Sequence, residues 1–251
     1  MVIILRSVHI GKKKYSLTNT CAFDSILQLF IAAYFDTENI KDFISTEIDF
    51  IFFELIKEVV TYGIKKSSYR LRVEILRQIF SGNISSNNCI LIDCQVTVGF
   101  LCRKLFTQYP TFRETSRCSN CCTERLKVLP LDFAELEKDI IILLQRCNQA
   151  NCDGFEITSI SYTDEGLLDV KLDDIPKKLK FSFMEKEHSL VGIVNYKSPV
   201  NTRHTSEEIG HYIALCYRKN KKWVQYDECK DSEIVLNDKY VACPHLILYS
   251  I

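Results

Sequence analysis

The sequence contains little glycine and proline, with eight and five residues among 251. Disordered and low-complexity segments are commonly rich in these residues, so the composition argues against a chain dominated by such segments. No stretch recurs along the chain, which argues against a repeat architecture. Hydrophobic residues make up 47% of the chain, enough to bury a sizeable core. We therefore expect residues 1–251 to form a single domain.

An excess of charge of one sign is also absent, because 32 basic residues balance 32 acidic ones. The chain thus lacks the overall field that attracts nucleic acid or an anionic membrane. Long apolar runs are missing as well, since stretches such as 48–56 are short and interrupted by charge. The first ten residues lack the pattern of a signal peptide. We expect a soluble protein of the cytosol or nucleus, with neither nucleic acid nor membrane as a partner.

Cysteine is plentiful, with twelve residues. In a secreted chain this number would indicate disulfides. In an intracellular chain of this length, metal binding and catalysis are the better explanations, and some cysteines simply belong to the core.

Cys21 stands between a polar segment, Thr18-Asn19-Thr20, and a run with the spacing of a helix that buries one face. The polar residues are candidate helix caps. A thiol at a helix start lies near unpaired N–H groups and the positive end of the helix dipole, which favours thiolate and hence a nucleophile. A buried structural cysteine is the alternative.

His211 is the best candidate base for Cys21, because it follows Gly210 at the start of a predicted strand. Asp227 follows the next predicted strand, after a polar turn at 218–222, so the two side chains should lie together near the open end of a hairpin. A carboxylate there can orient the imidazole and stabilise the imidazolium, as in a catalytic triad. Glu228 is the alternative orienting group.

Two cysteine pairs, Cys118-x2-Cys121 and Cys147-x4-Cys152, could supply four thiolates to a tetrahedral zinc ion. Cys122 could replace Cys121. Four thiolates leave no open position on the metal, so such a zinc would be structural. Free thiols that bind no metal are the alternative.

The patterns predict a helical N-terminal half, a cysteine-bearing insert, and a mainly antiparallel C-terminal sheet, which is an α+β arrangement. Expected helices cover 21–36, 40–62, 71–80, 95–108 and 133–146. Expected strands cover 2–8, 126–133, 155–162, 179–184, 189–196, 211–218, 222–226 and 245–249. The lysines at 12–14 are expected in a turn and residues 81–88 in a loop.

Taken in order, these pieces resemble the ubiquitin-specific protease family of cysteine deubiquitinases, as a divergent and compact member. Its cysteine box is matched by Asn19, Thr20, Cys21, Ser25, Leu27 and Gln28. Its histidine box is similar to the segment 210–214, followed by Trp223, Tyr226, Asp227 and Glu228. The four zinc-candidate cysteines fall between the two boxes in the order that the family shows.

The resemblance implies a papain-like fold with a helical thumb, an antiparallel β palm and a small zinc-ribbon-like fingers insert at residues 112–160. It implies ubiquitin as partner, and hydrolysis of the isopeptide bond after its C-terminal glycine by Cys21, His211 and Asp227. It also implies a structural Zn²⁺. A protease for another modifier such as SUMO, or a catalytically weak ubiquitin-binding scaffold, remains an alternative. One departure is Ser16, which stands where the family has an asparagine that donates to the oxyanion.

Overall fold

The computed structural model describes residues 7–47, 49–85, 88–106, 170–179, 187–197, 210–230 and 232–250, and the backbone of three short strands between 117 and 159. The chain divides into two compact units. The larger unit comprises Met1–Leu101 with Asp169–Ile251, and the smaller comprises Cys102–Leu168. Within the described residues, no helix combines the length and the apolar character needed to cross a membrane.

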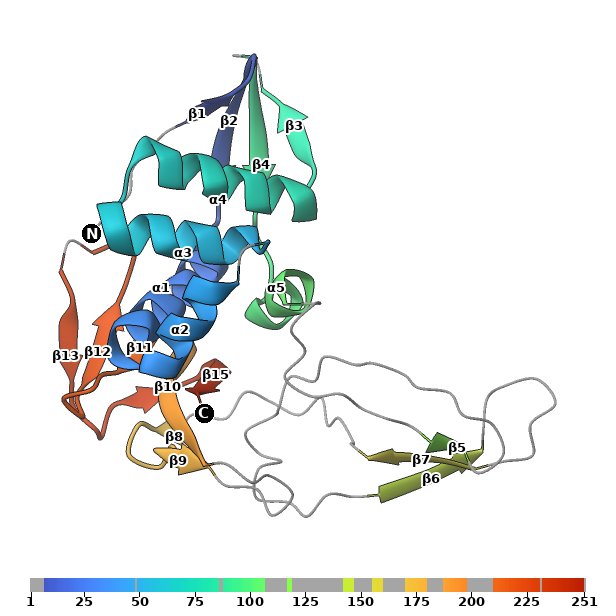
Figure 1. Ribbon diagram of the computed structural model, residues 1–251, viewed down its shortest axis with the longest axis vertical. Helices are drawn as coiled ribbons and strands as arrows, with labels where there is room; N and C mark the ends of the chain where they lie inside the picture. The colour runs from blue at the N-terminus through green and yellow to red at the C-terminus, as the bar shows by residue number, and fades with distance from the viewer. Residues whose placement is uncertain are drawn as a thin grey trace, which may run out of the picture. The chain divides into compact units, whose positions relative to one another are not determined.

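Helix α1, Cys21–Asp36, lies at the centre of the larger unit (Figure 1). Its bounds are those that the apolar spacing predicted. One face is buried, with the side chains of Ala22, Phe23, Ile26, Leu27, Leu29, Ala32 and Ala33. This face packs against strands β10 and β11.

Three further helices follow. Helices α2, Glu38–Thr46, and α3, Ile51–Tyr62, pack beside α1, and α4, Lys66–Ile79, packs against α3. The prediction of one continuous helix over 40–62 was wrong. Phe50 has an extended backbone, and its ring lies 4.7 Å from the ring of Phe53. Phe43 packs on the same ring, at 5.5 Å. Aromatic packing between the two pieces therefore favours a break that the apolar pattern alone does not show.

Above these helices in Figure 1 lies a four-stranded sheet in the order β1-β2-β4-β3. Its strands are β1, Val8–Ile10, β2, Lys13–Thr18, β3, Gly82–Ile84, and β4, Cys89–Asp93. Strands β2 and β4 are parallel, with Thr18 opposite Asp93.

Several predictions for this sheet were wrong. The lysine turn is limited to Gly11 and Lys12, because Lys13 and Lys14 belong to β2; the predicted loop 81–88 contains β3; and β4 was not predicted. These strands are short, and their pairing partners rather than their own pattern define them. Residues 2–6 of the first predicted strand lie outside the described residues.

The second sheet of the larger unit is antiparallel, in the order β13-β12-β11-β10-β15, with β9 also paired to β10. Its main strands are β10, His188–Lys197, β11, His211–Tyr217, β12, Trp223–Tyr226, and β15, Pro244–Ser250, all close to their predicted bounds. The short strands β9, Lys178–Leu179, and β13, Ile234–Leu236, complete it. Strands β8, Val170–Lys171, and β14, Val241–Ala242, form a separate pair. The predicted antiparallel C-terminal sheet is confirmed.

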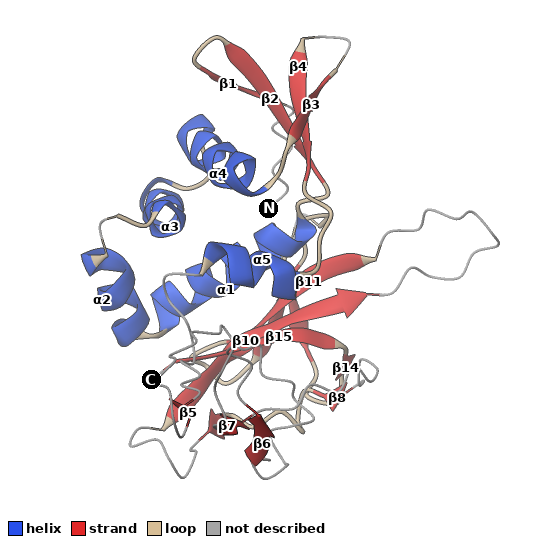
Figure 2. Cartoon of the chain, turned by 90° about the vertical axis from the view of Figure 1, so that its right-hand side faces the viewer, coloured by secondary structure: helices blue, strands red, loops and turns tan. Residues whose placement is uncertain are grey.

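Gly192 allows the close contact between this sheet and α1. A Cβ atom at this position would lie 2.4 Å from the carbonyl oxygen of Leu215 and 2.9 Å from a methyl carbon of Leu29. Any larger residue would therefore push the helix away from β10. Figure 2 shows α1 running alongside β10.

The smaller unit contains strands β5, Arg117–Cys118, β6, Ile142–Arg146, and β7, Phe155–Ser159, in the antiparallel order β5-β7-β6. The predicted helix over 133–146 is wrong at its end, because β6 pairs with β7 over five residues. A short apolar run such as 140–144 suits either structure, and the pairing partner decides. The rest of that helix and the predicted strand 126–133 lie outside the described residues. Helix α5, Val98–Leu105, is shorter than its prediction.

Arg218 connects the end of α1 to the hairpin of β11 and β12. Its Nε lies 2.5 Å from Oδ2 of Asp36 and its Nη2 lies 3.2 Å from Oδ1, so the pair is bidentate. Arg218 also donates to the hydroxyl of Tyr226. Burial opposes ionisation of Asp36, but the hydrogen bond from Arg218 and the Lys219 amide leave its pKa below the ordinary value.

We expect Asp36→Ala to lower the free energy of unfolding by about 2 kcal/mol, because it removes a bidentate charged pair and leaves a half-buried guanidinium without its carboxylate. Urea unfolding at neutral pH measures this. The matched control is Glu38→Ala, which removes the solvent-exposed Glu38–Lys41 pair and should have no resolvable effect. Equal effects of the two variants would contradict a role of Arg218 in joining helix to hairpin.

Candidate active site

Cys21 is the first residue of α1, and a turn of two residues, Asn19 and Thr20, separates it from the end of β2. The turn between them depends on Asn19, whose φ of 54° is in the left-handed region that asparagine tolerates. The Asn19 side chain donates to Oδ1 of Asp93 at 2.9 Å. The prediction that these polar residues cap the helix through their side chains was wrong for Thr20, the N-cap residue, which instead donates to Oδ2 of Asp24 at 2.7 Å.

The surroundings of the Cys21 thiol do not by themselves produce a thiolate. Burial raises its pKa above the ordinary value, and the carboxyl groups of Glu228 and Asp24 add to that effect. Hydrogen bonds from the backbone N–H groups of Tyr212 and Ala22 act in the opposite direction but do not outweigh burial. The helix start alone, which we expected to favour thiolate, is therefore insufficient. Ionisation of this sulfur needs a base.

His211 and Asp227 lie together at the open end of the β11–β12 hairpin, where the sequence placed them. The His211 Nε2 and the Asp227 Oδ1 are 2.9 Å apart. The Asp227 side chain is only 6% exposed, and its Oδ1 also accepts the backbone N–H of Cys229 at 3.0 Å. Burial acts to raise the pKa of Asp227, but the hydrogen bonds from His211 and Cys229 bring it below the ordinary value. Asp227 is thus an anion directed at the imidazole.

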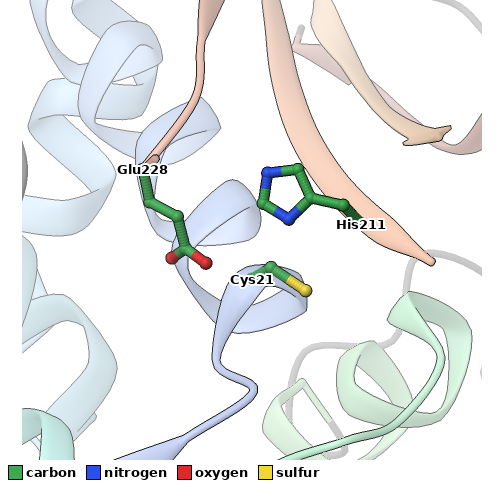
Figure 3. A group of neighbouring side chains, drawn as sticks. All are labelled: Cys21, His211 and Glu228. Carbon is green, nitrogen blue, oxygen red and sulfur yellow. The ribbon is translucent and has the colours of Figure 1, made fainter. Parts of the chain in front are cut away.

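The structure brings Cys21 and His211 together from distant parts of the sequence. The Cys21 sulfur, a ring nitrogen of His211 and a carboxyl oxygen of Glu228 all lie within 4.8 Å of one another. Figure 3 shows the three side chains meeting, with one nitrogen of the His211 ring turned toward Cys21. Since Nε2 is bound by Asp227, the remaining nitrogen, Nδ1, is available to the thiol.

The other described histidines have different surroundings. His245 accepts or donates a hydrogen bond with the Tyr212 hydroxyl, at 3.0 Å, and stacks on Tyr196. His9 lies exposed on β1. His204 lies outside the described residues.

Glu228 does not take the orienting role that the sequence left open for it. Its carboxyl group hydrogen-bonds to Asp24 instead. Burial and this contact with a second carboxyl raise the pKa of Glu228 to about 9, which favours the neutral acid at pH 7. Asp24 in turn forms an ion pair with Arg72, a residue of α4 whose side chain is 8% exposed. Arg72 was missed by the sequence analysis, because its position in α4 has no chemical motif around it.

A cavity of about 870 Å³ lies beside these groups. Its polar lining includes Ser16, Thr20, Asp24, Arg72, Asp227 and Glu228. Ser16 thus lies on β2 in the wall of a cavity that also contains the carboxyl groups of the site. Its apolar lining includes side chains from α1 and α3, such as Ile31 and Val59.

The predicted zinc cysteines cannot be compared with this geometry. Cys118 lies in β5, but its side chain, together with Cys121, Cys147 and Cys152, falls outside the described residues. In the described part, donor atoms suited to a metal converge in two groups: Cys21, His211 and Glu228; and His211, Asp227 and Cys229. Both groups share the ring of His211, whose Nε2 is already bound by Asp227.

No protein-family profile matches the chain. The 120.7 kDa protein in the NOF-FB transposable element of Drosophila melanogaster is 23% identical over 284 aligned residues, which cover 97% of this chain. The chain spans 26% of the length of that relative.

Among solved structures, a chain of the SAGA Ubp8/Sgf11/Sus1/Sgf73 DUB module has a TM-score of 0.50 and 15% identity, over 97% of this chain and 66% of that one. The chain has a DUB-module fold. The same module bound to ubiquitin aldehyde is also similar, with a TM-score of 0.42 and 14% identity over 97% of this chain and 69% of that chain. An identity of 15% shows the fold alone, and the mixed helix and sheet architecture agrees with the expected α+β class.

The Asp24–Glu228 pair should make stability depend on pH. Because the pKa of Glu228 rises from 4.5 to about 9 on folding, the native state holds a proton that the unfolded state releases between these values. This contribution is complete below pH 4.5 and is lost toward pH 9, with a slope of at most about 1.4 kcal/mol per pH unit. Glu228→Gln, which cannot ionise, should gain stability relative to wild type as pH rises through this window. Urea unfolding at a series of pH values measures the gain.

Glu54→Gln is the matched control, because Glu54 lies exposed on α3. It should show no gain of this kind. A constant difference between wild type and Glu228→Gln across the window would show that the Glu228 carboxyl is ionised in the native state.

Proposed function

We propose that this chain is a cysteine-type deubiquitinase in which Cys21 is the nucleophile, His211 the general base and acid, and Asp227 the group that orients His211. The meeting of the Cys21 sulfur and the His211 ring within 4.8 Å, with Asp227 behind the imidazole, carries the proposal. The similarity of the fold to a chain of a DUB module supports ubiquitin conjugates as the substrate class of this proposal.

The acylation step follows from the surroundings of the three groups. Asp227 accepts a hydrogen bond from the Nε2–H of His211, which leaves Nδ1 as the nitrogen that takes the proton of the Cys21 thiol. The resulting thiolate attacks the carbonyl carbon of the C-terminal glycine of ubiquitin. The tetrahedral intermediate then releases the lysine amine, which takes its proton from the imidazolium, and a thioester with Cys21 remains.

Deacylation uses the same groups in reverse. His211 removes a proton from water, the hydroxide attacks the thioester, and Cys21 leaves as thiolate and recovers its proton from His211. Asp227 stabilises the imidazolium in both halves. This cycle explains why a thiol whose pKa is raised by burial is still usable: the proton passes to a neighbour whose cation is held by a buried carboxylate.

Cys21→Ala should abolish hydrolysis of a ubiquitin C-terminal fluorogenic amide and labelling by a ubiquitin probe with a C-terminal electrophile. Cys229 is the matched control, because its sulfur also lies within 4.8 Å of a His211 nitrogen but in an exposed turn. Cys229→Ala should retain labelling, and mass spectrometry of the labelled peptide should identify Cys21.

Parallel probes built on ubiquitin and on SUMO compare the two candidate modifiers. Faster labelling by the SUMO probe would identify SUMO, and not ubiquitin, as the modifier that this chain cleaves. Equal turnover by wild type and Cys21→Ala would exclude Cys21 as the nucleophile. Binding of ubiquitin without labelling would identify a scaffold.

The second part of the proposal is a structural zinc in the insert at residues 112–160, held by Cys118, Cys121, Cys147 and Cys152. Purified protein should contain about one zinc per chain, since four thiolates complete a tetrahedral site. Cys147→Ser with Cys152→Ser should release the metal. His211→Ala should keep it, because the proposed ligands do not include the candidate active site. Protein purified without zinc, or zinc lost only with His211→Ala, would contradict this assignment.

A further inference from the structure

The contact between Glu228 and Asp24 places two carboxyl groups in one hydrogen bond beside the reactive sulfur. Two carboxylates repel each other at this distance, so one of them carries a proton. The neighbours decide which one. Asp24 accepts a hydrogen bond from Thr20 at 2.7 Å and forms the ion pair with Arg72, and both contacts stabilise its anionic form. Glu228 therefore holds the proton.

The charges around Glu228 support this distribution. Asp24 and Cys21 face it from α1, Arg72 from α4 and His211 from β11, while Asp227 precedes it in its own segment. Lys230 and Glu233, from the segment that follows, line the same cavity. Arg72 lowers the pKa of Glu228, but burial and the two aspartates outweigh it. With Glu228 neutral, Asp24 and Arg72 form an ion pair with each other, and Glu228 itself adds no negative charge beside the thiol.

We propose that Glu228 is a catalytic residue that acts as a neutral carboxylic acid and donates a hydrogen bond to the oxyanion of the tetrahedral intermediate formed on Cys21. This inference rests on the proposed function of the site. It gives Glu228 the role of oxyanion donor. The side chain of Ser16, which lines the same cavity, is shorter than an asparagine in that role would be.

The arrangement allows the donor to change its partner during the reaction. In the free protein the Glu228 proton is shared with Asp24. When charge develops on the substrate oxygen, the acid turns to the oxyanion, and Asp24 keeps Thr20 and Arg72 as donors. No covalent bond to hydrogen breaks in this step, because the proton stays on Glu228. The donor is already fixed near the sulfur, so little reorganisation is needed as the charge forms.

An anionic role for Glu228 fits the structure less well. The orienting position at Nε2 of His211 is held by Asp227. An ionised Glu228 would also raise the pKa of the Cys21 thiol and so oppose formation of the nucleophile. The neutral acid has neither disadvantage.

The test compares hydrolysis with a reaction of the same sulfur that forms no oxyanion. Kinetics on a ubiquitin C-terminal fluorogenic amide measure hydrolysis, and alkylation of Cys21 by iodoacetamide measures thiolate reactivity. Glu228→Ala should lower kcat by about 10²–10³-fold, as expected for loss of one oxyanion donor, and should not slow alkylation. Glu228→Gln keeps an N–H donor and should recover at least tenfold of the loss.

A fall in alkylation that parallels the fall in kcat would overturn the proposal, because Glu228 would then act on the thiol. A loss for Glu228→Gln as large as that for Glu228→Ala would also overturn it, since the amide keeps the donor. Glu54→Gln, on the exposed face of α3, is the control for both assays.

A third measurement separates this inference from the proposed function. Carboxyl ¹³C NMR, with the Glu228 signal assigned by its absence in Glu228→Gln, should show a protonated Glu228 at pH 7. Hydrolysis by wild type with an ionised Glu228 would overturn the oxyanion role alone. No hydrolysis of any modifier by wild type would overturn the proposed function, and the oxyanion role with it, even if Glu228 is protonated.

Discussion

The packing of α1 against β10 and β11 is the constraint on which the candidate site depends. The buried face of the helix lies on the sheet. Gly192 has no side chain, and any side chain at this position would hold helix and sheet apart. The helix begins at Cys21 and strand β11 begins at His211, so this packing determines the separation of sulfur and imidazole. At the other end of α1, the Asp36–Arg218 pair fixes the helix to the same hairpin. A site made from a helix start and a strand start therefore gains its precision from the core.

The electrostatics of the site follow from partial burial. Burial alone raises the pKa of the thiol and of Glu228, and thus favours neutral forms for both. The pKa of Asp227 is lowered by the hydrogen bonds from His211 and Cys229, while Asp24 accepts hydrogen bonds from Thr20 and Arg72. The sulfur therefore has near it both a carboxyl group with a raised pKa, Glu228, and two pairs that contain an aspartate, Asp24 with Arg72 and Asp227 with His211. Such an arrangement suits a reaction in which a proton leaves the sulfur first and negative charge appears on an oxygen later.

The predictions from sequence succeeded where an element is long and its pattern strong. The 16 residues of α1 and the alternating strands β10 and β11 were placed close to their observed bounds. The predictions failed where contacts with neighbouring segments determine the secondary structure. The helix is interrupted between α2 and α3 because Phe43 and Phe50 both pack on Phe53. Segment β6 is a strand because β7 pairs with it. Strands β3 and β4 were missed because a run of three to five residues carries little periodicity of its own.

The sequence by itself determined which groups could do chemistry: a cysteine at a helix start, a histidine at a strand start, and an aspartate after the neighbouring strand. Residue type and short-range spacing are local properties, so they can be read directly from the sequence. Only the tertiary structure decided that Asp227 and not Glu228 binds the imidazole, and that Glu228 faces Asp24 and Arg72. Protonation depends on burial and on contacts between α1, α4 and the segment after β12. Those contacts arise only when distant segments fold together, so no pattern within one segment encodes them.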